Sequence, residues 1–136
     1  MRGIKIDGET YDVRIVYETL SRSFEIIEGE NSGTSLSYRS IRDIQGTGYT
    51  YSMQVEPNPA NPAAYDSFYE KISEPVEYHT VEMPYGQSTI TFQAKIDSGQ
   101  DTYRGKIGGY NYWKGLTITF GYMQPQRTQA YGRFEQ

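Results

Sequence analysis

The chain has 136 residues, contains no cysteine and carries a formal net charge of −4 at pH 7. This length fits one domain with a core of its own. The lack of cysteine excludes disulfide bonds, thiolate metal sites and cysteine nucleophiles, and the acidic balance argues against a general nucleic-acid-coating role, which needs the opposite charge.

The first half of the chain alternates polar and apolar residues with a period of two, which predicts β-strands. The strands predicted in this half are residues 3–7, 10–19, 24–28 and 49–56. In the longest of them, four side chains are expected to share one face: Tyr11, Val13, Ile15 and Tyr17. The polar residues 34–47 predict an extended loop or an edge ribbon.

One segment in the middle of the chain has helical spacing instead. Its apolar side chains recur at i, i+3, i+4 and i+7, which predicts one buried helix face. The residues of this face are Tyr65, Phe68, Tyr69 and Ile72. Asn61 is expected to cap the first turn, Pro62 fits the first helical position, and Pro75 prevents continuation.

Strand periodicity resumes after the helix. The strands predicted in this half are residues 76–83, 88–97, 101–110 and 112–123, with turns at 84–87 and 98–100. Short connections favour antiparallel pairing. We therefore predict a mainly β fold, an antiparallel β-sandwich or β-barrel of about eight strands with one flanking helix at about residues 62–74. Residues 1–126 form the predicted domain, and residues 127–136 form a polar tail.

The sequence shows little that indicates catalysis. His79 is the only histidine, and a lone strand histidine without a recognisable nucleophile is usually structural. Residues 97–101 lack the further oxygen ligands of a calcium loop, and residues 105–109 lack the phosphate-loop pattern. We therefore predict no catalytic residue, no metal and no cofactor. Residues 1–7 lack the apolar segment of a signal peptide, and no apolar run is long enough for a membrane span.

Two groups of residues instead indicate binding surfaces. Tyr110, Tyr112 and Trp113 cluster beside Lys114. They either stack on sugar rings, as in a carbohydrate- or cell-surface-binding module, or anchor the start of the last strand. The second group consists of charged residues in the polar ribbon and the tail, which could pair with opposite charges on a neighbour: Arg39, Arg42, Asp43, Arg127 and Arg133.

Several motifs in this order resemble a known family. The opening strand reads Ile-Lys-Ile-Asp-Gly-Glu-Thr-Tyr-Asp-Val, and the helix continues as Phe-Tyr-Glu-Lys-Ile-Ser-Glu-Pro. The last strand reads Tyr-Trp-Lys-Gly-Leu-Thr-Ile-Thr-Phe before a proline-containing tail. Over residues 3–126, the chain resembles short structural proteins from the tail-morphogenesis modules of long-tailed phages and prophages.

This resemblance implies a non-enzymatic virion protein, made in the bacterial cytoplasm and built into a tail tube, distal-tail or adaptor ring. Such proteins form rings, commonly hexamers, around a DNA channel, and they contact other tail proteins. By resemblance, residues 29–47 would reach the next ring. DNA would pass through the channel without sequence-specific recognition, and no membrane would be involved. The two binding groups above then become the predicted assembly interface.

Overall fold

The computed structural model describes residues 2–29, 33–34, 40–41 and 44–128, and the statements below concern these residues. The strands are β1 (Arg2–Ile6), β2 (Glu9–Ile15), β3 (Ser21–Glu28), β4 (Gly33–Thr34), β5 (Ser40–Ile41), β6 (Ile44–Pro57), β7 (His79–Tyr85), β8 (Ser88–Lys95), β9 (Gly99–Ile107) and β10 (Tyr110–Tyr122). The helix is α1 (Pro62–Ile72), and β4 pairs only with β5.

Six of the strands close into an antiparallel barrel. Their order around the barrel is β6-β2-β1-β7-β8-β10. Closure follows from the pairing of β10 with β6, in which Leu116 lies opposite Val55 and Phe120 lies opposite Tyr51. Strands β3 and β9 lie outside this barrel, where β3 pairs with β6 and β9 pairs with β10. The barrel, one of the two predicted architectures, is therefore confirmed, with two outer strands and one short helix.

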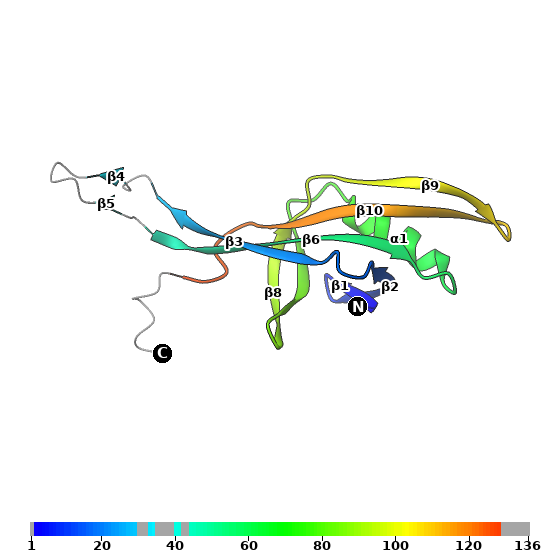
Figure 1. Cartoon of the computed structure of the whole chain (residues 1–136), viewed down its shortest axis with the longest axis horizontal. Helices are drawn as coiled ribbons and strands as arrows, with labels where there is room; N and C mark the ends of the chain where they lie inside the picture. Colours follow the sequence, from blue (N-terminus) through cyan, green and yellow to red (C-terminus); the bar gives the residue numbers. More distant parts are fainter. Residues whose placement is uncertain (1, 30–32, 35–39, 42–43, 129–136) are drawn as a thin grey trace.

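The two longest strands extend beyond the barrel and form two arms. Strand β6 has 14 residues and β10 has 13. The β3–β6 arm pairs residues 21–28 with residues 44–52, and the β9–β10 arm pairs residues 99–107 with residues 110–118. Figure 1 shows the arms pointing away from the barrel toward opposite ends of the long axis. The molecule is therefore elongated, and each end is a two-stranded ribbon.

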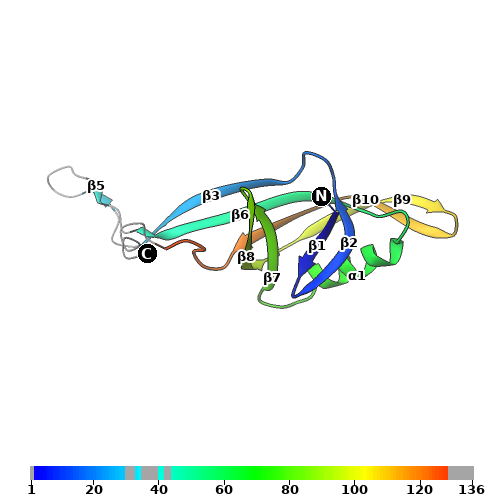
Figure 2. The same ribbon diagram turned by 90° about the horizontal axis from the view of Figure 1, so that it is seen from below.

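Helix α1 packs against the barrel through the predicted apolar face. Phe68 is fully buried and meets the ring of Tyr11 on β2 edge-on, at 5.9 Å between ring centroids. The hydroxyl of Tyr65 donates a hydrogen bond to Asp101 on β9 at 2.7 Å. Figure 2 shows the helix beside β1 and β2. The helix thus links the barrel wall to the base of the β9–β10 arm.

The core is one cluster that draws on the barrel strands and the helix. Alternation along each strand sends every second side chain inward, as the sequence predicts. Its buried side chains are Ile4, Ile6, Val13, Ile15, Tyr51, Met53, Val55, Tyr65, Phe68, Ile72, Val81, Met83, Phe92, Ala94, Leu116, Ile118 and Phe120.

Details of the helix prediction need correction. The helix ends at Ile72, and Ser73 is its C-cap. The hydroxyl of Ser73 donates a hydrogen bond to the carbonyl of Tyr69 at 2.7 Å. Tyr69 is 38 % exposed, so it lies at the border of the buried face. The side chain of Asn61 makes no capping hydrogen bond and donates instead to Asp12 at 3.3 Å. The proline at the first helical turn is as predicted.

Several strand boundaries also differ from the prediction. The strand predicted over residues 10–19 ends at Ile15, since Glu18 adopts a positive φ of 64°. Tyr17 consequently lies outside the core and is 86 % exposed. Strand β7 begins at His79, later than residue 76. The turn predicted at residues 98–100 is partly strand, because β9 begins at Gly99.

The polar ribbon and the tail overlap with the described residues only in part. Residues 44–47 of the predicted ribbon belong to β6. In the tail, Arg127 pairs with Thr47 on β6, and the Thr47 N–H donates to the Arg127 carbonyl at 2.7 Å. The side-chain amide of Gln126 bonds both the N–H and the carbonyl of Tyr49, at 2.8 and 3.0 Å. The beginning of the tail is therefore held against the β3–β6 arm.

Candidate functional site

The structure separates the predicted interface residues into two regions. Tyr110, Tyr112 and Trp113 lie on β10 in the β9–β10 arm. Arg127 lies beside β6, at the β3–β6 arm. These regions belong to opposite arms of the elongated molecule (Figure 1). The remaining predicted residues, Arg39, Arg42, Asp43 and Arg133, lie outside the described residues.

Both arms present an open strand edge within the described part of the chain. Strand β3 pairs only with β6, and β9 pairs only with β10. An edge strand offers unpaired N–H and carbonyl groups to another strand. Side chains near the two edges include several exposed apolar groups: Phe24, Tyr103, Ile107 and Tyr110. These are the surfaces on which another chain could add.

The β9–β10 arm, the end of β6 and Arg14 of β2 together line a pocket of about 320 Å³, which we call the basic aromatic pocket. Its charged and aromatic lining consists of Arg14, Glu56, Arg104, Tyr112, Trp113 and Lys114. Neighbouring residues on a regular strand point to opposite faces. Tyr112 and Trp113 nevertheless border the same pocket, because the pairing with β9 shifts between them.

The register shift is a β-bulge on β9. Tyr112 pairs with Gly105 and Trp113 pairs with Tyr103, which leaves Arg104 as the extra residue. Gly105 has a φ of +137°, a conformation that side chains disfavour. A bulge re-aims the side chains beside it, and here it brings Arg104 into the lining of the pocket. A second shift occurs directly after Lys114.

Arg14 enters the basic aromatic pocket from β2. Its Nη2 donates to the side-chain carbonyl of Asn58 at 3.3 Å, and Asn58 in turn donates to Asp12 at 3.0 Å. Asn58 is only 3 % exposed. The Nε of Arg14 is buried and has no hydrogen-bond partner among the described residues. The guanidinium is thus held in place by Asn58.

At the other arm, Arg127 belongs to a tyrosine cluster. The hydroxyls of Tyr49 and Tyr85 lie 3.1 Å apart, and Arg22 lies over the Tyr85 ring at 5.5 Å. The hydrogen bond with Tyr85 is the main cause that lowers the pKa of Tyr49, and Arg127 lowers it further. Tyr51 donates from the same area to the carbonyl of Pro84 at 2.7 Å. These contacts join the arm to the barrel.

His79 is buried and hydrogen-bonded, as expected for a structural histidine. It is 2 % exposed, and its Nδ1 lies 2.7 Å from a carboxylate oxygen of Asp7. The other carboxylate oxygen accepts the N–H of Thr80 at 2.8 Å. Since an ionised carboxylate only accepts, the Nδ1 of His79 carries the proton. This pairing links the β1–β2 turn to the start of β7.

The same place gathers three potential metal ligands, which the sequence did not reveal. Ligand atoms of Asp7, Glu74 and His79 all lie within 4.8 Å of one another. However, the Nζ of Lys71 lies 3.5 Å from both carboxylates and already supplies a cation. The Nε2 of His79 lies 3.9 Å from Glu74 and has no hydrogen-bond partner among the described residues, so no nucleophile contacts it there. Lys71, Glu74 and His79 stand close together in the sequence, whereas Asp7 comes from a distant segment, the β1–β2 turn.

The Asp7–His79 pair predicts a pH-dependent contribution to stability. Partial desolvation acts to raise the pKa of Asp7, but the hydrogen bonds from His79 and Thr80 outweigh it, so the pKa lies below its ordinary value of 3.8. A carboxyl group whose pKa is lower in the folded state than in the unfolded state stabilises the fold at pH values above its unfolded-state pKa. This stabilisation is lost as the pH falls through the folded-state pKa. Asparagine tolerates the positive φ of 51° at this position.

We therefore expect Asp7→Asn to lower the free energy of unfolding by about 1 kcal/mol at pH 7. The difference from wild type should shrink as the pH falls below 3.8 and through the lower pKa of the folded-state carboxyl, where the wild-type carboxylate also becomes protonated. Urea unfolding at pH 7 and pH 3 measures this. Asp97→Asn, at an exposed position, serves as the control. A difference that stays constant with pH would contradict the assignment.

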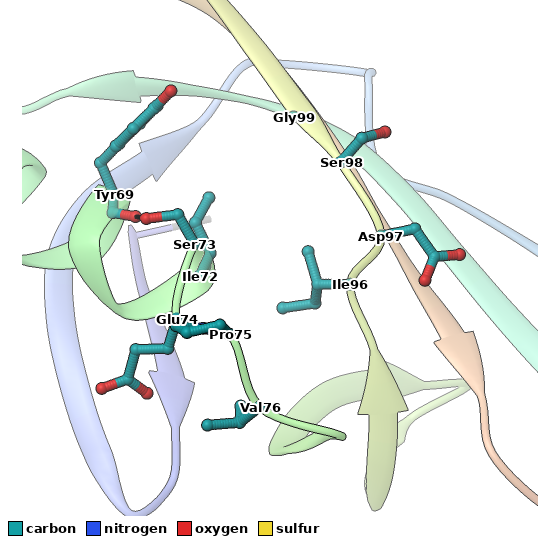
Figure 3. Close-up of a pocket in the computed structure, with 10 residues that line it drawn as sticks. All are labelled: Tyr69, Ile72, Ser73, Glu74, Pro75, Val76, Ile96, Asp97, Ser98 and Gly99. Carbon is teal, nitrogen blue, oxygen red and sulfur yellow. Dashed lines mark hydrogen bonds between the residues drawn. The ribbon is translucent and has the colours of Figure 1, made fainter.

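A further pocket of about 360 Å³ lies between the end of α1 and the β8–β9 connection. Ile72, Val76 and Ile96 supply apolar lining. Figure 3 shows Ile96 pointing toward the end of the helix, whereas the carboxylates of Glu74 and Asp97 point away from the space between them. The acids therefore do not converge as a catalytic pair would.

Comparison with known proteins adds no relative. No protein-family model matches the chain, and no curated protein matches it. Within the described residues, no helix has the length and apolar character needed to cross a membrane.

Proposed function

We propose that this protein is a non-enzymatic structural component of a phage or prophage tail that assembles with copies of itself into a ring around the DNA channel. A hexamer is the expected ring, and other tail proteins are its expected neighbours in the virion. The observation that carries the proposal is the pair of open-edged arms at opposite ends of one barrel. The family resemblance of residues 3–126 supports the same function.

The charges on the two edge strands support contact between unlike ends of neighbouring copies. Strand β3 carries one arginine and two glutamates, Arg22, Glu25 and Glu28, for a net charge of −1. Strand β9 carries one aspartate and two cations, Asp101, Arg104 and Lys106, for a net charge of +1. Opposite charges facing each other across strands are favourable. A contact between different surfaces of each copy closes into a ring when the rotation permits.

The overall charge also suits a channel for DNA. Duplex DNA carries a dense row of phosphates, and a chain with a net charge of −4 repels it. A wall that does not hold phosphates lets DNA move through. This supports passage of DNA without sequence-specific recognition.

We expect the purified protein to form multimers of one defined size. Multi-angle light scattering over a wide range of concentrations gives the mass, and negative-stain electron microscopy shows whether the particles are rings. A strictly monomeric protein at all concentrations would contradict the proposal. Open filaments would support unlike-end contacts but overturn ring closure.

A further inference from the structure

The basic aromatic pocket combines positive charge with aromatic rings in an acidic chain. Its lining contains three cations, Arg14, Arg104 and Lys114, and one acid, Glu56, which leaves a net charge of +2. The whole chain carries −4. Such a local reversal of charge attracts an anion.

The geometry of the pocket indicates a group that accepts hydrogen bonds. Asn58 holds the guanidinium of Arg14 through Nη2, and Arg14 lines the pocket. Guanidinium groups bind carboxylates through charge-assisted hydrogen bonds that are often bidentate. The bulge at Arg104 brings a second guanidinium into the lining. Bulges are frequent beside functional sites for this reason.

The aromatic part of the lining indicates what carries the carboxylate. Tyr112 and Trp113 are partly buried and border the pocket beside the cations. Aromatic rings pack well against the apolar C–H face of a sugar ring, while the polar edge of the sugar stays available for hydrogen bonds. A volume of about 320 Å³ lies at the small end of ligand pockets. The pocket therefore fits one ring better than an extended chain.

We propose that the basic aromatic pocket binds an acidic sugar, a pyranose whose carboxylate meets Arg14, Arg104 and Lys114 while its ring packs against Tyr112 and Trp113. This binding function is additional to ring assembly and does not depend on it. It assigns a ligand to the aromatic cluster that the sequence had left open between sugar stacking and strand anchoring.

The pocket contains its own reporter, because Trp113 is the only tryptophan. Trp113 also borders a second pocket lined by Asp66, Glu70 and Asp101. The charge of the added sugar therefore decides which of the two pockets binds it. Methyl glucuronide, methyl glucoside and methyl glucosaminide offer the same ring with negative, neutral and positive charge. Each is titrated against the full chain while Trp113 fluorescence is recorded.

We expect a saturable fluorescence change with the glucuronide and at least tenfold weaker binding of the other two sugars. Removing one charged partner with Arg104→Gln or Lys114→Gln should weaken glucuronide binding about tenfold, the loss expected for one charge-assisted hydrogen bond. Lys95→Gln removes a positive charge from an exposed position on β8 and should leave binding unchanged. Circular dichroism confirms that each variant is folded.

Three results would overturn the proposal. The first is no saturable change with glucuronide up to about 10 mM, a concentration beyond any useful affinity. The second is equal binding of glucoside and glucuronide, or equal weakening by Lys95→Gln and Arg104→Gln. The third is binding of a glutamate pentapeptide as tightly as the glucuronide, which would assign the pocket to acidic peptides. Rings seen by microscopy, or their absence, affect none of these outcomes.

Discussion

Replacing Phe68 with alanine is expected to remove about 3–5 kcal/mol from the free energy of unfolding. Phe68 is fully buried on α1 and packs edge-on against Tyr11. Truncation would remove this ring from the core and leave a cavity between the helix and β2. Because domains of this kind have total stabilities of about 5–15 kcal/mol, this loss is a substantial fraction of the total. Urea unfolding followed by circular dichroism measures the loss.

Tyr69→Ala is the matched control, since it truncates an aromatic residue on the same helix at the next position. Tyr69 is 38 % exposed and belongs to the rim of the buried face. We expect its loss to cost about 1 kcal/mol, the ordinary cost of a single substitution. Equal losses in the two variants would mean that the helix does not cover the barrel through Phe68.

Replacing Lys106 with proline is expected to abolish assembly while leaving the fold intact. The β9–β10 arm turns at Gly108 and Gly109, whose φ values of 58° and 87° suit a two-residue hairpin turn. Ile107 and Tyr110 then form the hydrogen-bonded closing pair, so the N–H of Lys106 points away from β10. Proline removes this outward donor and is tolerated on edge strands.

Lys106→Ala separates the backbone effect from the loss of the side chain, because it keeps the N–H group. Light scattering should show monomers for the proline variant and wild-type multimers for the alanine variant. Circular dichroism should be the same for both. Multimers of unchanged mass in the proline variant would show that copies do not add strands at the β9 edge.

Local patterns accounted for the elements of this fold but not for its closure. The helix from Pro62 and the alternation in β8 and β10 follow from periodicities that neighbouring residues create themselves. Sandwich and barrel share these periodicities. Whether the chain forms a sandwich or a barrel depends on the pairing of Leu116 with Val55, residues that are far apart in the chain. Such contacts leave no local signal.

The residues of the basic aromatic pocket likewise divide into those that the sequence indicates and those that only the fold brings there. Tyr112 and Trp113 stood out because they cluster in sequence beside Lys114. Arg14 and Arg104 did not, since one comes from β2 and the other reaches the pocket through a bulge. The positive φ available to Gly105 was a weak signal that could have suggested the bulge.

By itself, the sequence determined a mainly β chain with one amphipathic helix, without thiol chemistry and with a net negative charge. These properties depend on composition and on spacing within single segments. Only the tertiary structure decided that the strands close into a barrel, that two arms leave it in opposite directions, and that three cations meet two aromatic rings. The physical reason is that register, bulges and barrel closure arise from contacts between distant segments, whose free energies act only once the chain has folded.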